Sequence, residues 1–334
     1  MTMPDFTELV DLAAAALGGT VIAANDEFFA PKEGLLKPTP AEWREGEYTE
    51  RGKWMDGWET RRRRTPGHDW AIIHLGAPGV VRGVVIDTSF YRGNYPESAS
   101  IDGCNVPGTP SAETLTSEAT VWRTVLKKSP LAGDTHNRFD IKHERRVTHL
   151  RLNIFPDGGV ARLRVYGDVQ ATLPDAAHAV IDLAAIENGG YSVVCSDMFF
   201  GHRQNLIMPG RSTHMGNGWE TQRRRGPGHD WTVIRLAHPG EIERVELDTD
   251  HYKGNAPDSC MLESCYLPLA ATADSLTDPA VRWTKIVARA KLQSHARHTF
   301  APRVLSPATH VRLSIYPDGG VARLRLFGHR AVPV

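Results

Sequence analysis

The sequence predicts an all-β protein built from two tandem β-sandwich domains of the jelly-roll type. Three observations predict this fold: a long internal repeat, short runs that are β-branched or alternate apolar with polar residues, and Pro- and Gly-rich turns between those runs. Helical periodicity is almost absent. Many short strands separated by such turns are typical of a sandwich or jelly roll.

The repeat divides the chain into two copies. Residues 57–60, 66–70 and 156–164 recur 161 positions later as residues 218–221, 227–231 and 317–325. A repeat of this length indicates a duplicated domain and not a short-period solenoid. We therefore place the first domain at residues 1–170 and the second at residues 171–334, with a linker over residues 168–179.

Near the N-terminus the two copies match at a different offset. Residues 11–14 pair with residues 182–185, at an offset of 171, so the first copy carries an insertion between Phe29 and Asp56. The insertion is rich in proline and charge, which predicts a loop. The stretch over residues 11–17 predicts a short helical turn, as does its copy.

Local patterns place individual strands in the first domain. Residues 70–75 and 80–87 predict two strands separated by the turn-forming Ala-Pro-Gly at residues 77–79. Residues 150–155 and 161–166 alternate apolar with polar side chains on either side of Pro-Asp-Gly-Gly, which predicts a hairpin.

Composition excludes several functional classes. Lys plus Arg equal Asp plus Glu at 39 each, so the formal net charge of zero argues against nucleic acid or a membrane surface as the main partner. No stretch approaches the roughly 18 apolar residues that span a bilayer, and no signal peptide is evident. The four cysteines form no CxxC pair, so we expect a cytoplasmic chain with reduced, inert thiols.

Four consecutive arginines follow the repeated Trp-Glu-Thr. In an alternating strand, Arg61 and Arg63 would face one side and Arg62 and Arg64 the other. A guanidinium group matches a carboxylate bidentately, so one pair would line an anion-binding pocket. The alternative is a structural salt bridge.

The repeated Gly-His-Asp-Trp offers a second candidate group. In a functional interpretation, His68 is a general acid or base with a pKa near neutrality. In the structural alternative, Asp69 is a turn or cap residue and His68 is a packed polar group. The same two interpretations apply to His229 and Asp230.

Polar residues also follow the strand that ends at Asp87. Loops at strand ends favour binding, and Gly93 permits a positive φ that would aim Asn94 inward. Asn94 offers both a hydrogen-bond donor and an acceptor. Alternatively, Asp87 terminates the strand and Gly93 and Asn94 form a turn. Turn chemistry explains residues 156–159 without any function, but not Arg162 just beyond them.

No cofactor is predicted. HExxH, CxxC, HxH and DxDxDG spacings are missing, as are a GxSxG elbow, a P-loop and a Rossmann fingerprint. The two His-Asp pairs could supply ligands across loops, so a divalent metal stays open without support from any ligand spacing.

Two resemblances sharpen the picture. The order of turns and strands resembles galactose-binding-like (discoidin-type) jelly rolls, in which the loop before Trp58, the loop after Asp87 and the loop at Asp157 gather at one end. The strings at residues 56–64, 66–70, 86–96 and 155–165, together with residues 25–30 and the duplication, resemble the allantoicase family over nearly the whole chain.

The allantoicase resemblance implies hydrolysis of allantoate to ureidoglycolate and urea in purine (allantoin) catabolism, and a homo-oligomer of duplicated jelly rolls. Release of intact urea breaks the Cα–N bond, so the site needs a carboxylate clamp, an amide-type partner such as Asn94 for a ureido group, and acid–base groups. The expected catalytic residues are Glu59, His68, Asp69, Glu220, His229 and Asp230. The expected substrate-binding residues are Arg61, Arg63, Asp87, Asn94, Arg162, Arg224, Asp248, Asn255 and Arg323.

Alternatives remain at this point. Galactose-binding-like domains usually bind without catalysing, so the rival hypothesis is a carbohydrate- or small-ligand-binding module. The copies also differ, for example Asp56 becomes Asn217 and Arg61 becomes Gln222. Either copy could therefore be a scaffold, or the site could be composite.

Overall fold

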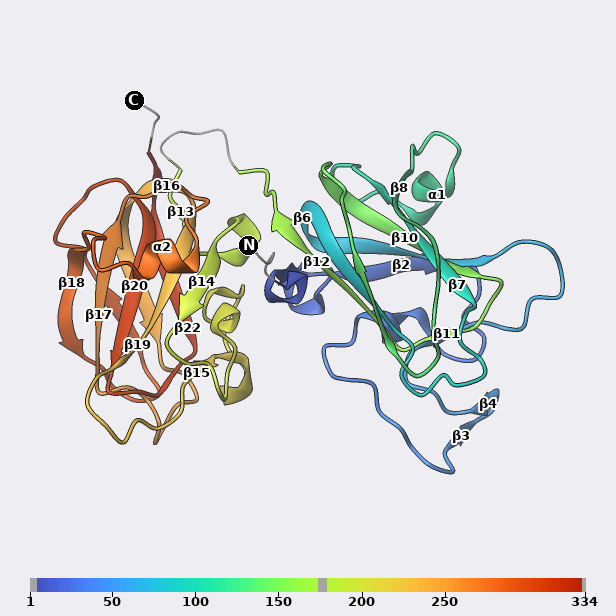
Figure 1. The fold of residues 1–334 in the computed structure, drawn as a ribbon, viewed down its shortest axis with the longest axis horizontal. Helices are drawn as coiled ribbons and strands as arrows, with labels where there is room; N and C mark the ends of the chain where they lie inside the picture. Colours follow the sequence, from blue (N-terminus) through green and yellow to red (C-terminus); the bar gives the residue numbers. More distant parts are fainter. Residues whose placement is uncertain (1–4, 174–178, 332–334) are drawn as a thin grey trace. The chain divides into compact units, whose positions relative to one another are not determined.

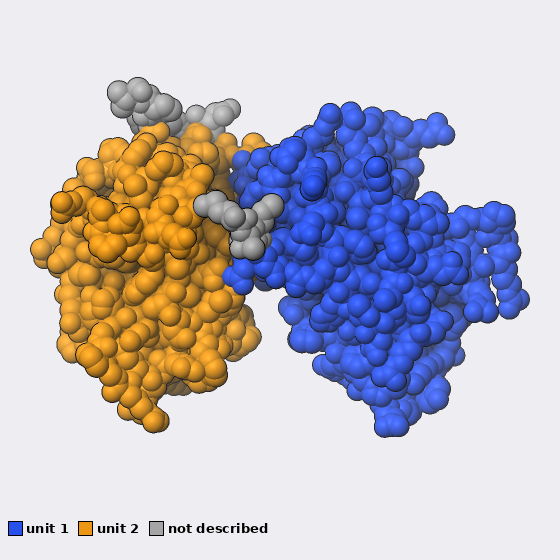
Figure 2. Space-filling view, in the orientation of Figure 1, with its two compact units in different colours: residues 1–171 blue, residues 172–334 orange. Residues whose placement is uncertain are grey.

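The computed structural model describes residues 5–173 and 179–331, which form two compact units, residues 1–171 and 172–334 (Figure 2). The main strands of the first unit are β1 (Val10–Asp11), β2 (Thr20–Ala24), β6 (Asp69–Asp87), β7 (Ser98–Cys104), β8 (Arg123–Pro130), β9 (His136–Asp140), β10 (Val147–Phe155) and β12 (Arg162–Val169). The second unit repeats them as β13 (Ile181–Asp182), β14 (Tyr191–Cys195), β16 (Asp230–Asp248), β17 (Ser259–Cys265), β18 (Thr284–Lys291), β19 (Arg297–Phe300), β20 (Ala308–Tyr316) and β22 (Arg323–Arg330).

One long strand organises each unit (Figure 1). The first half of β6 pairs with β2 and β10, and the second half pairs with β9 and β12, all antiparallel. β7 and β8 extend the β10 side, and β1 extends the β12 side. The sheet therefore has two arms that share β6. β16 holds the same position in the second unit.

The predicted break in this strand is wrong. Residues 70–75 and 80–87 belong to one strand of 19 residues that runs through the expected turn. Between His74 and Gly79 the ladder with β10 is interrupted. Pro78 therefore lies where β10 forms no hydrogen bonds with β6. The strand can continue through Pro78 because the N–H that proline lacks has no partner there.

The predicted hairpin is also wrong. β10 pairs with β6 and β7, whereas β12 pairs with β6 and β1, so the two strands lie in different arms. The Pro-Asp-Gly-Gly turn between them crosses from one arm to the other. Its last glycine begins β11 (Gly159–Val160), which pairs with β5 (Trp58–Glu59). The second unit repeats this pair with β21 (Gly320–Val321) and β15 (Trp219–Glu220).

The insertion of the first unit is mostly loop, as predicted. It contains one 3-10 helix, η3 (Lys32–Leu36), and a two-residue hairpin of β3 (Tyr48–Thr49) and β4 (Gly52–Lys53) that projects from the first unit (Figure 1). The corresponding part of the second unit holds η5 (Arg203–Ile207) and η6 (Met215–Asn217).

Other short helices complete both units. The expected helical turns are η2 (Ala15–Leu17) and η4 (Ile186–Asn188). The remaining helices are η1 (Phe6–Glu8), α1 (Ala112–Thr116) and α2 (Ala273–Thr277). Nothing helical in the described ranges has both the length and the apolar character of a membrane span.

Buried apolar side chains fill each unit. Trp58 and Tyr91 in the first unit and Trp219 and Tyr252 in the second are fully buried beneath the loops. The all-β fold with two tandem sandwich domains is thus confirmed. The predicted linker begins inside β12, which ends at Val169, and its residues 174–178 lie outside the described residues.

Candidate active site

The loop after Asp87 and the loop at Asp157, which the resemblance to discoidin-type jelly rolls groups together, contact each other in the first unit, and Thr60, just after Trp58, joins them. The backbone N–H of Gly159 donates to the carbonyl of Asn94 at 2.8 Å, and that of Thr60 donates to the carbonyl of Gly158 at 3.1 Å. The repeated polar residues therefore meet around a common set of backbone contacts.

Glu59 and Asn94 form one cluster. The Asn94 amide donates to Glu59 Oε1 at 2.7 Å, and Asn255 bonds Glu220 in the same way in the second unit. Burial raises the pKa of Glu59, and the hydrogen bond from Asn94 opposes that rise. The expected positive φ at Gly93 is not found. The residue with a positive φ in this loop is Phe90, at 69°.

The arginine run is not a strand, because β5 ends at Glu59. Arg61 pairs with Asp26 across 2.6 Å, and Arg63 Nη1 donates to the buried Asp69 at 2.6 Å. Arg224 pairs with Asp230 in the second unit. Arg61 and Arg63 of the run, and Arg224 in the second unit, thus each have a carboxylate partner within the protein. Their substrate-binding roles stay predictions.

His68 lies apart from these carboxylates. Its ring packs on Phe155 with centroids 4.7 Å apart, and His229 packs on Tyr316 at 4.5 Å. Within the described ranges no hydrogen bond joins His68 to Glu59 or Asp69. Burial lowers the pKa of His229. Catalytic roles for the two histidines also stay predictions.

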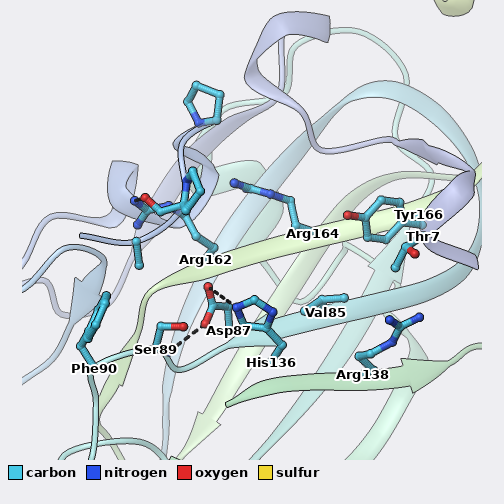
Figure 3. A pocket seen from close by; sticks show the side chains of 13 residues that line it. Thr7, Val85, Asp87, Ser89, Phe90, His136, Arg138, Arg162, Arg164 and Tyr166 are labelled. Atoms are coloured by element: carbon cyan, nitrogen blue, oxygen red, sulfur yellow. Dashed lines mark hydrogen bonds and ion pairs between the residues drawn. The ribbon is translucent and has the colours of Figure 1, made fainter. Parts of the chain in front are cut away.

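A pocket of about 360 Å³ opens beside the end of β6 and β9 (Figure 3). We call it the first-repeat pocket. Its polar lining residues are Thr7, Asp87, Ser89, His136, Arg138, Arg162, Arg164 and Tyr166. Figure 3 shows Asp87, Ser89 and His136 together, with Arg164 above them in the view.

Asp87 and His136 lie side by side in this pocket. His136 Nε2 lies 3.6 Å from Asp87 Oδ2, and the backbone N–H of Ser89 donates to Asp87 Oδ1 at 2.8 Å. The Asp87 side chain is only 10% exposed, whereas that of His136 is 69% exposed. A buried carboxylate thus lies behind an imidazole that is exposed to solvent.

His136 and Arg138 share one face of β9. They are two residues apart in a strand that pairs Asp87 with His136 and Val85 with Arg138. Side chains two apart point to the same side of a sheet, at about 7 Å spacing. The strand therefore presents an imidazole and a guanidinium together to the first-repeat pocket.

Arg162 has a different environment. Its side chain is 2% exposed, and Nη2 donates to Asp56 Oδ2 at 2.5 Å. All three nitrogens donate to protein acceptors, including the carbonyls of Thr39 and Pro40 in the insertion. A substrate-binding role would require this network to open, and it stays a prediction.

Sequence analysis named Asp87 and Arg162 of this pocket but not His136, Arg138 or Arg164. Arg164 belongs to the repeated run at residues 156–164, so the repeat itself offered the signal. His136 and Arg138 correspond in register to Arg297 and Thr299. A search for shared residues could not have found them.

The second unit has a smaller pocket in the equivalent place, of about 230 Å³. We call it the second-repeat pocket. It is lined by Gly210, Arg211, Glu246, Asp248, Arg297, Arg323, Arg325 and Phe327. It has carboxylates at Glu246 and Asp248 but no imidazole among these residues.

The described residues contain no group of three or more His, Cys, Asp or Glu side chains positioned to hold a metal ion. All four cysteines are free, and burial raises the pKa of Cys104 and Cys265 to about 11 and that of Cys260 to about 12.

Comparison with known proteins identifies the family. The profile described as Allantoicase repeat matches residues 10–170 and 181–331. A probable allantoicase of Stutzerimonas stutzeri (strain A1501) is 49% identical over 326 residues, covering 97% of each chain. Probable allantoicase 1 of Burkholderia mallei (strain ATCC 23344) is 48% identical, covering 97% of this chain and 96% of its own.

Solved structures agree with the sequence matches. The crystal structure of allantoicase from Saccharomyces cerevisiae aligns with a TM-score of 0.79 at 34% identity, covering 96% of this chain and 93% of that one. A second allantoicase structure aligns with a TM-score of 0.80 at 34% identity, covering 96% and 94%. The chain therefore belongs to the allantoicase family.

Proposed function

We propose that this allantoicase-family hydrolase cleaves allantoate to ureidoglycolate and urea in the first-repeat pocket, as a step of purine catabolism. The observation that carries the location is the shared face of β9, which presents His136 and Arg138 to a pocket that also holds Asp87. The equivalent residues of the second repeat, Arg297 and Thr299, supply no imidazole.

Each residue has a role that follows from the substrate. Arg138 holds the carboxylate of allantoate. Its Nη2 donates to Asp5 and its guanidinium group lies over the Phe6 ring, so within the described chain Nε and Nη1 keep no hydrogen-bond partner. Side chains two apart on a strand are about 7 Å apart. With its carboxylate bound to Arg138, allantoate would therefore place a leaving ureido nitrogen near His136. Asp87 orients the imidazole and stabilises its cationic form.

The reaction balances with one proton carrier. Protonated His136 donates to the departing urea nitrogen while the second ureido nitrogen supplies electrons to Cα, and the Cα–N bond breaks. Water then adds to Cα and gives a proton back to the neutral imidazole. The products are urea and ureidoglycolate, and His136 ends as it began.

Glu59 with Asn94 is the rival acid. Its raised pKa suits a proton donor, and Asn94 suits a ureido group. His68 is the other rival. Glu59 and His68 were expected to be catalytic and Asn94 to bind substrate, and separate variants distinguish Glu59 and His68 from His136.

The test compares urea release by H136N, R138Q, E59Q and H68N. We expect H136N to lower kcat about 10²- to 10⁴-fold, the usual range for a general acid or base. R138Q should chiefly raise KM. Imidazole added to H136A should restore turnover, because His136 is exposed and a merely structural role would show no rescue. Normal turnover by H136N, together with loss of turnover in E59Q or H68N, would assign the general acid to Glu59 or His68 and refute the role of His136.

We also propose a cytoplasmic, homo-oligomeric enzyme. The free thiols support a reducing compartment. Sedimentation of the purified chain tests the oligomer, and cell fractionation tests the compartment.

A further inference from the structure

Arg162 in the first repeat has a carboxylate partner that its counterpart in the second repeat, Arg323, lacks. Arg162 and Arg323 hold the same register, opposite Asp87 and Asp248. Asp56, which pairs with Arg162, is replaced by Asn217. The Asn217 side chain turns to Ser212 and Thr213 instead.

The two guanidinium groups differ in the hydrogen bonds that Nε and Nη2 donate. Nη1 of each donates to three backbone carbonyls, which for Arg323 are those of Asn205, Asn217 and Ala322. Nε and Nη2 of Arg162 donate to Thr39, Pro40 and Asp56. Nε and Nη2 of Arg323 have no hydrogen-bond partner within the described ranges, and Nε is buried.

The missing insertion explains the difference. Thr39 and Pro40 lie in the stretch of the first repeat that is ten residues longer than its counterpart in the second. The shorter segment brings no carbonyl to this edge. Nε and Nη2 form the side of a guanidinium that matches the two oxygens of a carboxylate.

Arginines outnumber carboxylates around that charge: Glu246 and Asp248 line the pocket beside four arginines. Arg323 is 6% exposed, and it lines the second-repeat pocket with Arg211, Arg297 and Arg325. Arg325 Nη1 is also buried without a partner. Burial lowers the pKa of Arg323 to about 10, so it is still protonated at neutral pH. Asp248 and Glu187 act on it through space, but neither hydrogen-bonds to it in the described ranges, and a buried cation whose donors lack acceptors is costly.

The carboxylates nearby do not fill the open edge. Asp248 lies 3.9 Å from Arg297, Asp250 pairs with Arg211, and Asp182 lies 3.6 Å from Arg325. Glu246, which also lines the pocket, pairs with Arg244. Within the described ranges, none of these carboxylates accepts a hydrogen bond from Arg323. The pocket thus combines four guanidinium groups with an unfilled donor edge at its buried member.

We propose that the second-repeat pocket binds a small carboxylate on the Nε–Nη2 edge of Arg323, and that it does so without hydrolysing it. The volume of about 230 Å³ limits the ligand to a small molecule. The pocket lacks the imidazole that the first repeat supplies. The binding claim goes beyond the proposed function and stands or falls separately from it.

Calorimetric titration with N-carbamoylglycine tests the proposal. This ureido carboxylate lacks the second ureido nitrogen that would expel the first, so it is a probe and not a substrate. The full wild-type chain should bind two equivalents, one in each repeat. The neutral amide of the same compound should not bind in the second-repeat pocket.

The decisive variant is N217D, which restores to Arg323 the carboxylate that Arg162 has in Asp56. We expect the second site to weaken at least tenfold, with turnover kept. Q222E adds the same charge at an exposed position of the same repeat and should change affinity less than twofold. R323K keeps the charge but loses the paired donors, so it should also weaken binding.

The first repeat provides the comparison. R138Q should remove the other equivalent, so its failure to do so would count against the proposed function alone. Unchanged affinity in both N217D and R323K would overturn the second site. Loss of turnover in a folded N217D would also overturn it, since Arg323 would then belong to the hydrolytic site.

Discussion

Replacing Asp56 with Asn should destabilise the first repeat by about 3 kcal/mol. Asp56 is a buried carboxylate that accepts from Arg162 at 2.5 Å, from the Glu42 backbone at 3.0 Å and from Lys37 at 2.6 Å. Removing one partner of a buried ion pair costs about 3–5 kcal/mol. The backbone carbonyls that remain around Arg162 favour the lower end of this range.

The effect also depends on pH. Burial by itself raises the pKa of Asp56, but hydrogen bonds from Arg162, Lys37 and Glu42 outweigh it and lower the pKa below its ordinary value. A carboxyl with a lowered folded pKa contributes stability above its unfolded pKa and loses it as pH falls through the folded value. The difference between wild type and D56N should therefore narrow in acid.

Thermal and urea unfolding of the full chain measure the change. For a repeat of this size, about 3 kcal/mol corresponds to roughly 6–12 °C in Tm. The control is E47Q in the same insertion, whose exposed pair with Arg44 is worth less than about 1 kcal/mol. If D56N were no more destabilising than E47Q, the buried pair would not hold the insertion, and the account of Arg162 would fail.

Two further outcomes follow from buried positions. Burial lowers the pKa of His149 to about 4. Its contribution to stability is therefore fully present above its unfolded pKa near 6.5 and is lost as pH falls toward 4. H149Q should flatten this part of the curve of unfolding free energy against pH, and an unchanged slope would contradict the prediction. A Cβ at Gly57 would lie 2.5 Å from the carbonyl oxygen of Val160 and 2.8 Å from the Tyr91 hydroxyl, whereas one at Gly93 meets nothing within 4 Å; G57A should lower Tm by several degrees and G93A should not, and equal Tm values would refute the steric argument.

The sequence predicts the duplication and the β-rich fold because both leave local signals. It misplaces β6 because Pro78 and Gly79 carry turn chemistry, and only the partner strands show that a gap in the ladder accommodates them. The hairpin fails for a similar reason. The turn at residues 156–159 is real, but it joins two arms and not two paired strands.

The candidate site shows the same limit. Contacts among repeated residues, such as Glu59 with Asn94, follow from positions that both copies keep. His136 depends on the pairing of β9 with β6, which is not visible in the sequence, and it has no repeat partner to mark it. Ion pairs of the arginine run involve Asp26 and Asp69, which no spacing rule connects to it.

The shared central strand has a consequence for how each repeat folds and can be divided. Because β6 is one continuous strand that pairs in both arms, detaching either arm exposes the backbone donors and acceptors of the half of β6 that it covers. Each repeat is therefore one cooperative folding unit. A chain break between Gly76 and Gly79 would sever the strand that joins the two arms, whereas a break near the exposed Gly46 in the insertion would leave that strand intact.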